Sequence, residues 1–88
     1  MARIVGTYKI LPEDTDIDLD LLKENISKVL PEDVRISASG KRPLAFGLVA
    51  LIVDINFAEQ DGLQDEIEEI LAKVEGVSEI EALQLFRL

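Results

Sequence analysis

The segment LAFGLVALIVDINF, residues 44–57, constrains the fold of this chain more than any other stretch. Its alternate residues form an unbroken apolar face, and the opposite face is also apolar as far as Asp54 and Asn56. A strand that is apolar on both faces belongs in the interior of a sheet, with a neighbour on each side. The sequence therefore predicts a long central strand whose main apolar face consists of Ala45, Gly47, Val49, Leu51, Val53, Ile55 and Phe57.

Two amphipathic helices are predicted, one before and one after this strand. Asp18 is suited to cap the first helix and Pro31 to end it. Its apolar residues recur at helical spacing at Leu19, Leu22, Ile26 and Val29. In the second helix, Asp61 and Gln64 have the spacing of a capping box, and Gly76 is suited to cap the C-terminal end. Its apolar face consists of Leu63, Ile67, Ile70, Leu71 and Val74.

Three further strands are indicated by residue alternation. In ARIVGTYKIL, residues 2–11, one face carries polar side chains (Arg3, Thr7 and Lys9) and the other apolar ones (Ile4, Tyr8 and Ile10). DVRISAS, residues 33–39, predicts a shorter strand with Val34, Ile36 and Ala38 on one face, and GKRP, residues 40–43, predicts a break. VSEIEALQLFRL, residues 77–88, predicts the last strand.

The predicted order of elements is therefore βαββαβ. Two amphipathic helices that bury their apolar faces on one sheet give a two-layer α+β sandwich. Right-handed crossovers favour the ferredoxin-like arrangement, an antiparallel sheet of order 4-1-3-2 with both helices on one face. We expect one shared core that includes Leu22, Ile26, Val49, Leu51, Val53, Ile67 and Leu71. The fold by itself does not indicate a function, because it hosts many unrelated ones.

The composition narrows the possible functions. The chain has 88 residues and a formal net charge of −9, and it contains neither Cys nor His. A chain without Cys and His has no thiol or imidazole chemistry, no disulfides and no Cys/His zinc site. The negative charge disfavours general binding to nucleic acid or anionic lipid, because both reward Lys and Arg. No apolar run approaches the roughly 20 residues of a membrane span, and no signal peptide is evident. We expect one domain over residues 1–88 in a soluble, cytoplasmic protein.

The sequence contains only weak candidates for a catalytic, metal-binding or nucleic-acid-binding site. The acidic runs at residues 14–20 and 65–69 indicate a helix start and a solvated helix face rather than a catalytic pair. DINFAEQDG lacks the acidic ligand and the glycine that a calcium loop requires. Phe46 and Arg3 are too isolated for an RNA-recognition sheet, and no phosphate-binding glycine loop lies near Arg35. We therefore predict no catalytic residue, no metal site and no cofactor.

Two stretches resemble archaeal translation elongation factor 1-beta. RPLAFGLVAL, residues 42–51, resembles the segment of that family in which Pro and an apolar residue precede Ala-Phe-Gly-Leu. VEGVSEIEALQLFRL, residues 74–88, resembles its closing segment, in which Glu-Gly-Val leads into a final strand ending on a cation and Leu. TYKILPEDTDIDLDLLKENI, residues 7–26, is similar to the start of the family. The resemblance spans nearly the whole chain.

The resemblance implies a guanine nucleotide exchange domain that acts on elongation factor 1-alpha, in its GDP-bound and nucleotide-free states, without contacting nucleic acid or membrane. It implies partner-binding roles for Phe46, Gly47, Arg87 and Leu88. In the eukaryotic relatives, the cation beside the C-terminal residue is a Lys that reaches the magnesium and phosphate site, and Arg87 matches its position. Phe46 matches a Phe that contacts a second domain of the elongation factor. The Arg guanidinium is planar with several donors, whereas the Lys ammonium is a compact charge, so the two are not interchangeable. The resemblance therefore leaves two roles for Arg87, displacing magnesium or pairing with a switch-region carboxylate.

Other interpretations of these residues remain open from sequence. In one interpretation, Arg87 only keeps the end of the last strand hydrated, or it pairs with Glu79 or Glu81. In the other, Phe46 packs on the sheet against Leu48 or the first strand. Because the third and fourth strands run in the same direction in this topology, Phe46 and Arg87 should lie about 30 Å apart, at ~3.3 Å per residue. The alternative function is a small-molecule-sensing ferredoxin-like domain that dimerises through its sheet.

Overall fold

A computed structural model describes residues 2–88 of the chain. The elements follow one another in the predicted βαββαβ order. They are β1 (Arg3–Pro12), α1 (Leu19–Val29), β2 (Arg35–Pro43), the short turn η1 (Ala45–Gly47), β3 (Val49–Ala58), α2 (Leu63–Lys73) and β4 (Val77–Arg87).

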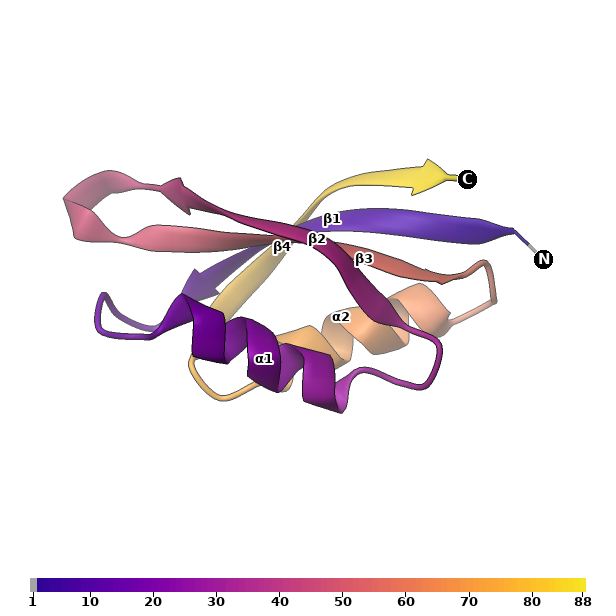
Figure 1. Cartoon of the computed structure of the whole chain (residues 1–88), viewed down its shortest axis with the longest axis horizontal. Coiled ribbons are helices and arrows are strands. Elements are labelled where there is room, and N and C mark those ends of the chain that lie inside the picture. The colour runs from indigo at the N-terminus through magenta and orange to yellow at the C-terminus, as the bar shows by residue number, and fades with distance from the viewer. Residues whose placement is uncertain (1) are drawn as a thin grey trace.

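The four strands form one antiparallel sheet in the order β2-β3-β1-β4. This is the predicted order 4-1-3-2 counted from the other edge. Both helices lie on one face of the sheet and leave the other face open (Figure 1). The fold is therefore the predicted ferredoxin-like two-layer α+β sandwich. The apolar β3 lies in the interior of the sheet, as expected of a strand that buries side chains on both faces.

The core lies between the sheet and the helices. In β1, Tyr8 and Ile10 are fully buried, while the alternate residues Thr7 and Lys9 lie on the open face. The predicted core set is confirmed, since all of its members are buried in one cluster except Val49, which is partly buried against it. That cluster includes Leu22, Ile26, Leu51, Val53, Ile67 and Leu71.

Helix α1 begins where the sequence predicts. The Asp18 carboxylate accepts hydrogen bonds from the backbone amides of Asp20 at 3.0 Å and Leu21 at 3.2 Å, which satisfies two otherwise unpaired groups. The helix ends at Val29, before Pro31. The expectation that Val29 belongs to the buried face is wrong, because it is 51% exposed at the last turn. The buried residues of α1 are Leu19, Leu22 and Ile26.

Helix α2 begins differently from the prediction. Its N-cap is Gly62, with φ of 81°, and no side chain caps the helix. The capping box expected at Asp61 and Gln64 is therefore wrong, because a left-handed glycine turns the chain into the helix at this point. At the other end, the C-cap is Val74, and Gly76 lies two residues further on with φ of 94°. Gly76 thus forms the turn into β4 rather than the cap itself.

The first half of β2 also differs from simple alternation. Its register against β3 shifts between Ile36 and Ala38. Ile36 lies opposite the buried Ile55, whereas Ala38 lies opposite Asp54 on the open face. The expected shared face is confirmed for Val34, which lies in the core, and for Ile36, which packs against it. It is wrong for Ala38, because the irregularity after Ile36 reverses the alternation.

The boundary between β2 and β3 lies further along the chain than predicted. The stretch 40–43 belongs to β2 rather than to a break, and β3 begins only at Val49. The expected apolar face is confirmed from Val49 to Phe57, but Ala45 and Gly47 lie outside the strand. The turn that separates the two strands carries two of the predicted partner-binding residues.

Candidate partner-binding site

The β2–β3 turn holds Phe46 and Gly47 in left-handed backbone conformations. The Leu44 amide donates a hydrogen bond to the Leu48 carbonyl over 2.7 Å, and the Leu48 amide donates to the Ala45 carbonyl over 3.2 Å. Between these bonds, Phe46 has φ of 60° and ψ of 31°, and Gly47 has φ of 78°. Glycine adopts such values freely, but the left-handed conformation costs other residues roughly 1–2 kcal/mol. A phenylalanine is therefore a strained choice at this position.

The Phe46 side chain is completely exposed, with 100% of its surface accessible. The interpretation that it packs on the sheet against Leu48 or β1 is therefore wrong. An isolated exposed apolar residue is ordinary, but this one combines exposure with backbone strain. Neither feature stabilises the fold, so packing within the domain gives no reason for a phenylalanine at this position.

Arg87 lies at the opposite end of the sheet, at the end of β4. Its side chain is 71% exposed, and its Nε atom lies 2.6 Å from Oε2 of Glu59, which directly follows β3. The alternative pairing with Glu79 or Glu81 is wrong. Glu81 instead pairs with Lys9, at 3.0 Å. Arg87 is thus an exposed cation held by one carboxylate of the β3–α2 loop.

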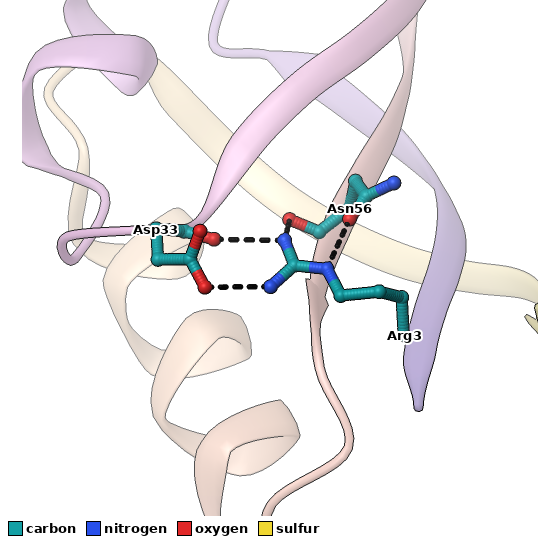
Figure 2. Close-up of polar contacts among 3 residues, drawn as sticks. All are labelled: Arg3, Asp33 and Asn56. Atoms are coloured by element: carbon teal, nitrogen blue, oxygen red, sulfur yellow. Dashed lines mark hydrogen bonds and ion pairs between the residues drawn. The ribbon is translucent and has the colours of Figure 1, made fainter. Parts of the chain in front are cut away.

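The start of β1 anchors this end of β4. The Leu88 amide donates to the Arg3 carbonyl over 2.9 Å, while the Leu88 side chain is 71% exposed. The Arg3 guanidinium reaches between Asp33 and Asn56 (Figure 2). It donates to Oδ1 of Asn56 at 2.8 Å, to Oδ2 of Asp33 at 2.6 Å and to the Asp33 carbonyl at 2.9 Å. Arg3 therefore ties the α1–β2 loop and β3 to the strand that positions Leu88 and Arg87.

A hollow of about 540 Å³ lies beside Arg87. Three carboxylates line it, those of Glu59, Asp61 and Asp65. Within residues 2–88, no three acidic side chains come together as a metal site requires. The hollow is therefore an acidic surface next to one cation.

The two candidate regions lie at opposite ends of the molecule. β3 and β4 each run antiparallel to β1, so they run parallel to each other. Phe46 precedes the first residue of β3 and Arg87 is the last residue of β4. Because β3 has 10 residues, the separation is roughly 30 Å at ~3.3 Å per residue, within a longest dimension of 42 Å. The structure thus confirms that the two residues lie at opposite ends.

One ionisable group in the core has a perturbed pKa. The buried Tyr8 hydroxyl donates to Oε2 of Glu68 over 3.0 Å, and the Gln64 amide donates to the same oxygen over 3.0 Å. Burial, and then the hydrogen bond to Glu68, raise the pKa of Tyr8 far above its ordinary value. The phenol therefore stays neutral and links β1 to α2, which is a structural role.

These features define a class of protein. The domain is a small ferredoxin-like module with an exposed, strained aromatic residue at one end of its sheet and the exposed Arg87 at the other. No helix among residues 2–88 is long and apolar enough to cross a membrane.

Comparison with known proteins identifies the family. The sequence matches the family described as EF-1 guanine nucleotide exchange domain over residues 5–88. It is 40% identical over 88 residues to elongation factor 1-beta of Methanothermobacter thermautotrophicus, a match that covers 100% of this chain and 99% of the relative. It is 42% identical over 89 residues to elongation factor 1-beta of Staphylothermus marinus, with coverage of 100% and 99%. The chain therefore belongs to the elongation factor 1-beta family, and its function is guanine nucleotide exchange for elongation factor 1-alpha, without bond chemistry of its own.

A solved structure supports the fold separately. The C-terminal domain of the MgtC protein from Mycobacterium tuberculosis has a TM-score of 0.58 over 98% of this chain and 87% of that chain. The sequence identity is 8%, so this likeness shows the fold alone.

Two contacts at the Arg87 end were missed by reasoning from sequence. Glu59 holds Arg87, and Arg3 joins Asp33 to Asn56. Both contacts join segments far apart in the chain, and they depend on the register between strands. Local periodicity carries no signal for that register.

Proposed function

We propose that this domain contacts elongation factor 1-alpha at both ends of its sheet. Phe46 and Gly47 dock on one part of the partner, and Arg87 with Leu88 reaches the nucleotide site. The observation that carries the proposal is the exposure of Phe46 and Arg87 at opposite ends of one sheet. In this proposal residues 1–88 act as one domain, in the cytoplasm, where the partner takes part in protein synthesis.

Exchange by such a domain is a coupling between two binding equilibria. The domain binds the GDP-bound partner and binds the nucleotide-free partner more tightly. By reciprocity, the same free-energy difference weakens nucleotide binding while the domain is bound. A two-point contact serves this purpose, because docking at Phe46 keeps Arg87 close to the nucleotide site while the nucleotide leaves.

The contact between Arg87 and Glu59 suits a cation that changes partners. Both side chains are partly exposed, at 71% and 39%, and an exposed ion pair contributes only ~0–1 kcal/mol. Releasing Glu59 in favour of a group on the partner therefore costs little. A guanidinium binds carboxylates and phosphates in a bidentate manner, which suits both modes of action: competing with magnesium or pairing with a switch-region carboxylate.

The direct test is release of a fluorescent GDP analogue from elongation factor 1-alpha with wild-type or Arg87→Ala domain. We expect catalysed release to slow at least about tenfold, equivalent to ~1.4 kcal/mol in the barrier. The melting temperature should change by only a few degrees, because the lost ion pair is exposed. Arg87→Lys should retain more activity than Arg87→Ala.

The matched control is Lys28→Ala. Lys28 also forms an exposed ion pair, with Glu24 at 3.8 Å, but lies on α1. Lys28→Ala removes one positive charge, as Arg87→Ala does. The exchange rate with Lys28→Ala should therefore stay at the wild-type level. A wild-type rate for Arg87→Ala would refute the role proposed for that end of the sheet.

Magnesium concentration separates the two modes of action. If Arg87 competes with magnesium, raising free magnesium should reduce the advantage of the wild-type domain over Arg87→Ala. If Arg87 pairs with a carboxylate, the ratio of the two rates should not depend on magnesium.

A further inference from the structure

The β2–β3 hairpin contains the longest stretch of this acidic protein without an acidic residue. No acidic residue occurs between Asp33 and Asp54, although the chain has a formal net charge of −9. The same stretch contains three cations, Arg35, Lys41 and Arg42. It includes all of β2, the turn and the first half of β3. The hairpin is thus a basic arm on an acidic body.

The cation nearest the tip of this arm is free to meet a partner. Arg42 lies opposite Ala50, on the face of the sheet that no helix covers, and it is exposed. It forms no ion pair within residues 2–88. Its neighbour Lys41 points the other way and holds Asp20 of α1 at 3.2 Å. A shallow hollow of about 410 Å³ beside Arg42 leaves room for a contacting group.

The arm is also well placed to act first in an encounter. Its turn lies at the end of the molecule opposite the end of β4, clear of the helices (Figure 1). Phe46, completely exposed, follows Arg42 closely at that tip. Because charges are screened over ~8 Å at physiological ionic strength, a partner that meets the open face at the tip senses Arg42 more strongly than Lys41, whose charge Asp20 of α1 offsets.

We propose that the β2–β3 hairpin is an electrostatic docking arm, in which Arg42 recognises an acidic protein surface bordering the apolar pocket that receives Phe46. This rests on the proposed docking of Phe46 on elongation factor 1-alpha and adds the chemistry of the surface that it meets. Complementary charge of this kind raises the rate of association and fixes orientation more than it raises affinity. Arg42 therefore directs the encounter, and Phe46 holds the complex once it has formed.

An acidic protein surface fits these observations better than RNA. Modules that bind single-stranded nucleic acid stack successive bases on several aromatic side chains along a basic groove. Between Asp33 and Asp54 the only aromatic residue is Phe46. A long polyanion would also extend beyond the arm and meet the acidic remainder of the domain, whereas a local carboxylate cluster on a protein would not.

The test is stopped-flow association with elongation factor 1-alpha for Arg42→Glu and Lys73→Glu. Each variant replaces one cation by one anion, so both change the formal net charge from −9 to −11. Lys73 is exposed on the last turn of α2, outside the arm. At about 50 mM salt, Arg42→Glu should slow association on the order of tenfold and Lys73→Glu less than about twofold. The difference should shrink at about 0.5 M salt, and Arg42→Lys should behave as wild type.

Three outcomes would overturn the proposal. Equal slowing by Arg42→Glu and Lys73→Glu would show that only net charge matters. If Arg42→Glu associates at the wild-type rate while Phe46→Ala still weakens binding, Phe46 docks on the partner as proposed. Arg42 then does not recognise an acidic surface there. Binding of a labelled oligouridine by the free domain at physiological salt, lost in Arg42→Glu, would identify RNA as the ligand of the arm. If Phe46→Ala also has no effect, the proposed function fails with it.

Discussion

Replacing Phe46 by glycine should separate binding from stability. Phe46 has φ of 60° in the β2–β3 turn, a conformation that costs a residue with a Cβ atom roughly 1–2 kcal/mol and costs glycine almost nothing. The substitution removes that strain from the folded state. We therefore expect Phe46→Gly to fold at least as stably as the wild type.

The size of the change follows from the exposure of the side chain. Because Phe46 is 100% exposed, its removal loses no buried apolar surface, and the hydrophobic loss is close to zero. Glycine also makes the unfolded chain more flexible, which takes back roughly 0.5–1 kcal/mol. The balance is a gain of about 0–1.5 kcal/mol, and each kcal/mol raises the melting temperature by ~4–8 °C for a domain of this size.

The affinity for elongation factor 1-alpha should fall in Phe46→Gly, although the stability should not. Truncation of an aromatic anchor at an interface typically costs ~2 kcal/mol or more, which is about thirtyfold in Kd. The assay is urea unfolding followed by far-ultraviolet circular dichroism, together with titration of elongation factor 1-alpha by calorimetry. Phe46→Ala is the matched control, because it removes the aromatic ring and keeps the strain. It should bind as weakly as Phe46→Gly, with stability within about 0.5 kcal/mol of the wild type.

Two results would refute this reasoning. A loss of more than about 1 kcal/mol of stability in Phe46→Gly would mean that the side chain packs on the domain in solution. An unchanged Kd in both variants would mean that the exposed ring does not contact the partner.

Two further predictions concern the core. Val53→Ala should destabilise the domain by about 1–3 kcal/mol, because Val53 is fully buried on the interior strand β3; a neutral effect on urea unfolding would contradict this. In Tyr8, folding raises the pKa above the ordinary value of 10.0, so its contribution to stability is complete below about pH 10 and is lost as the pH rises beyond it. Thermal unfolding between about pH 8 and pH 11 should therefore show a steeper alkaline loss for the wild type than for Tyr8→Phe, and parallel profiles would refute the assignment.

Local sequence patterns predicted the elements that local physics controls. Alternation placed Tyr8 and Ile10 on the buried face of β1, and helical spacing placed Leu22 and Ile26 in the core. Asp18 was recognised as a cap because a short acidic side chain before an apolar stripe satisfies free amides within a few residues. In each case the determining contacts lie close together in the chain or follow from one repeating period.

The β2–β3 turn escaped prediction because its pattern imitates a strand. Ala45, Gly47 and Val49 continue the apolar alternation of β3 into the turn, so periodicity places the strand start too early. Pro43 and Gly47 at its two ends were the signal for a turn, since these residue types are typical of tight reversals. The left-handed conformation of Phe46 had no signal at all, because the closing hydrogen bonds impose it on a residue that does not favour it.

The division between buried and exposed parts follows from the position of each strand in the sheet. β1 and β3 lie in the interior and supply most of the buried strand residues, so substitutions there act on stability. β2 and β4 lie at the edges, and their ends carry Arg42 and Arg87 where each remains exposed. Because β1 and β3 are paired along nearly their full length, they hold the two ends at a fixed separation. A partner whose sites have the same spacing can engage both ends without deforming the domain, so little of the binding energy is spent on ordering it.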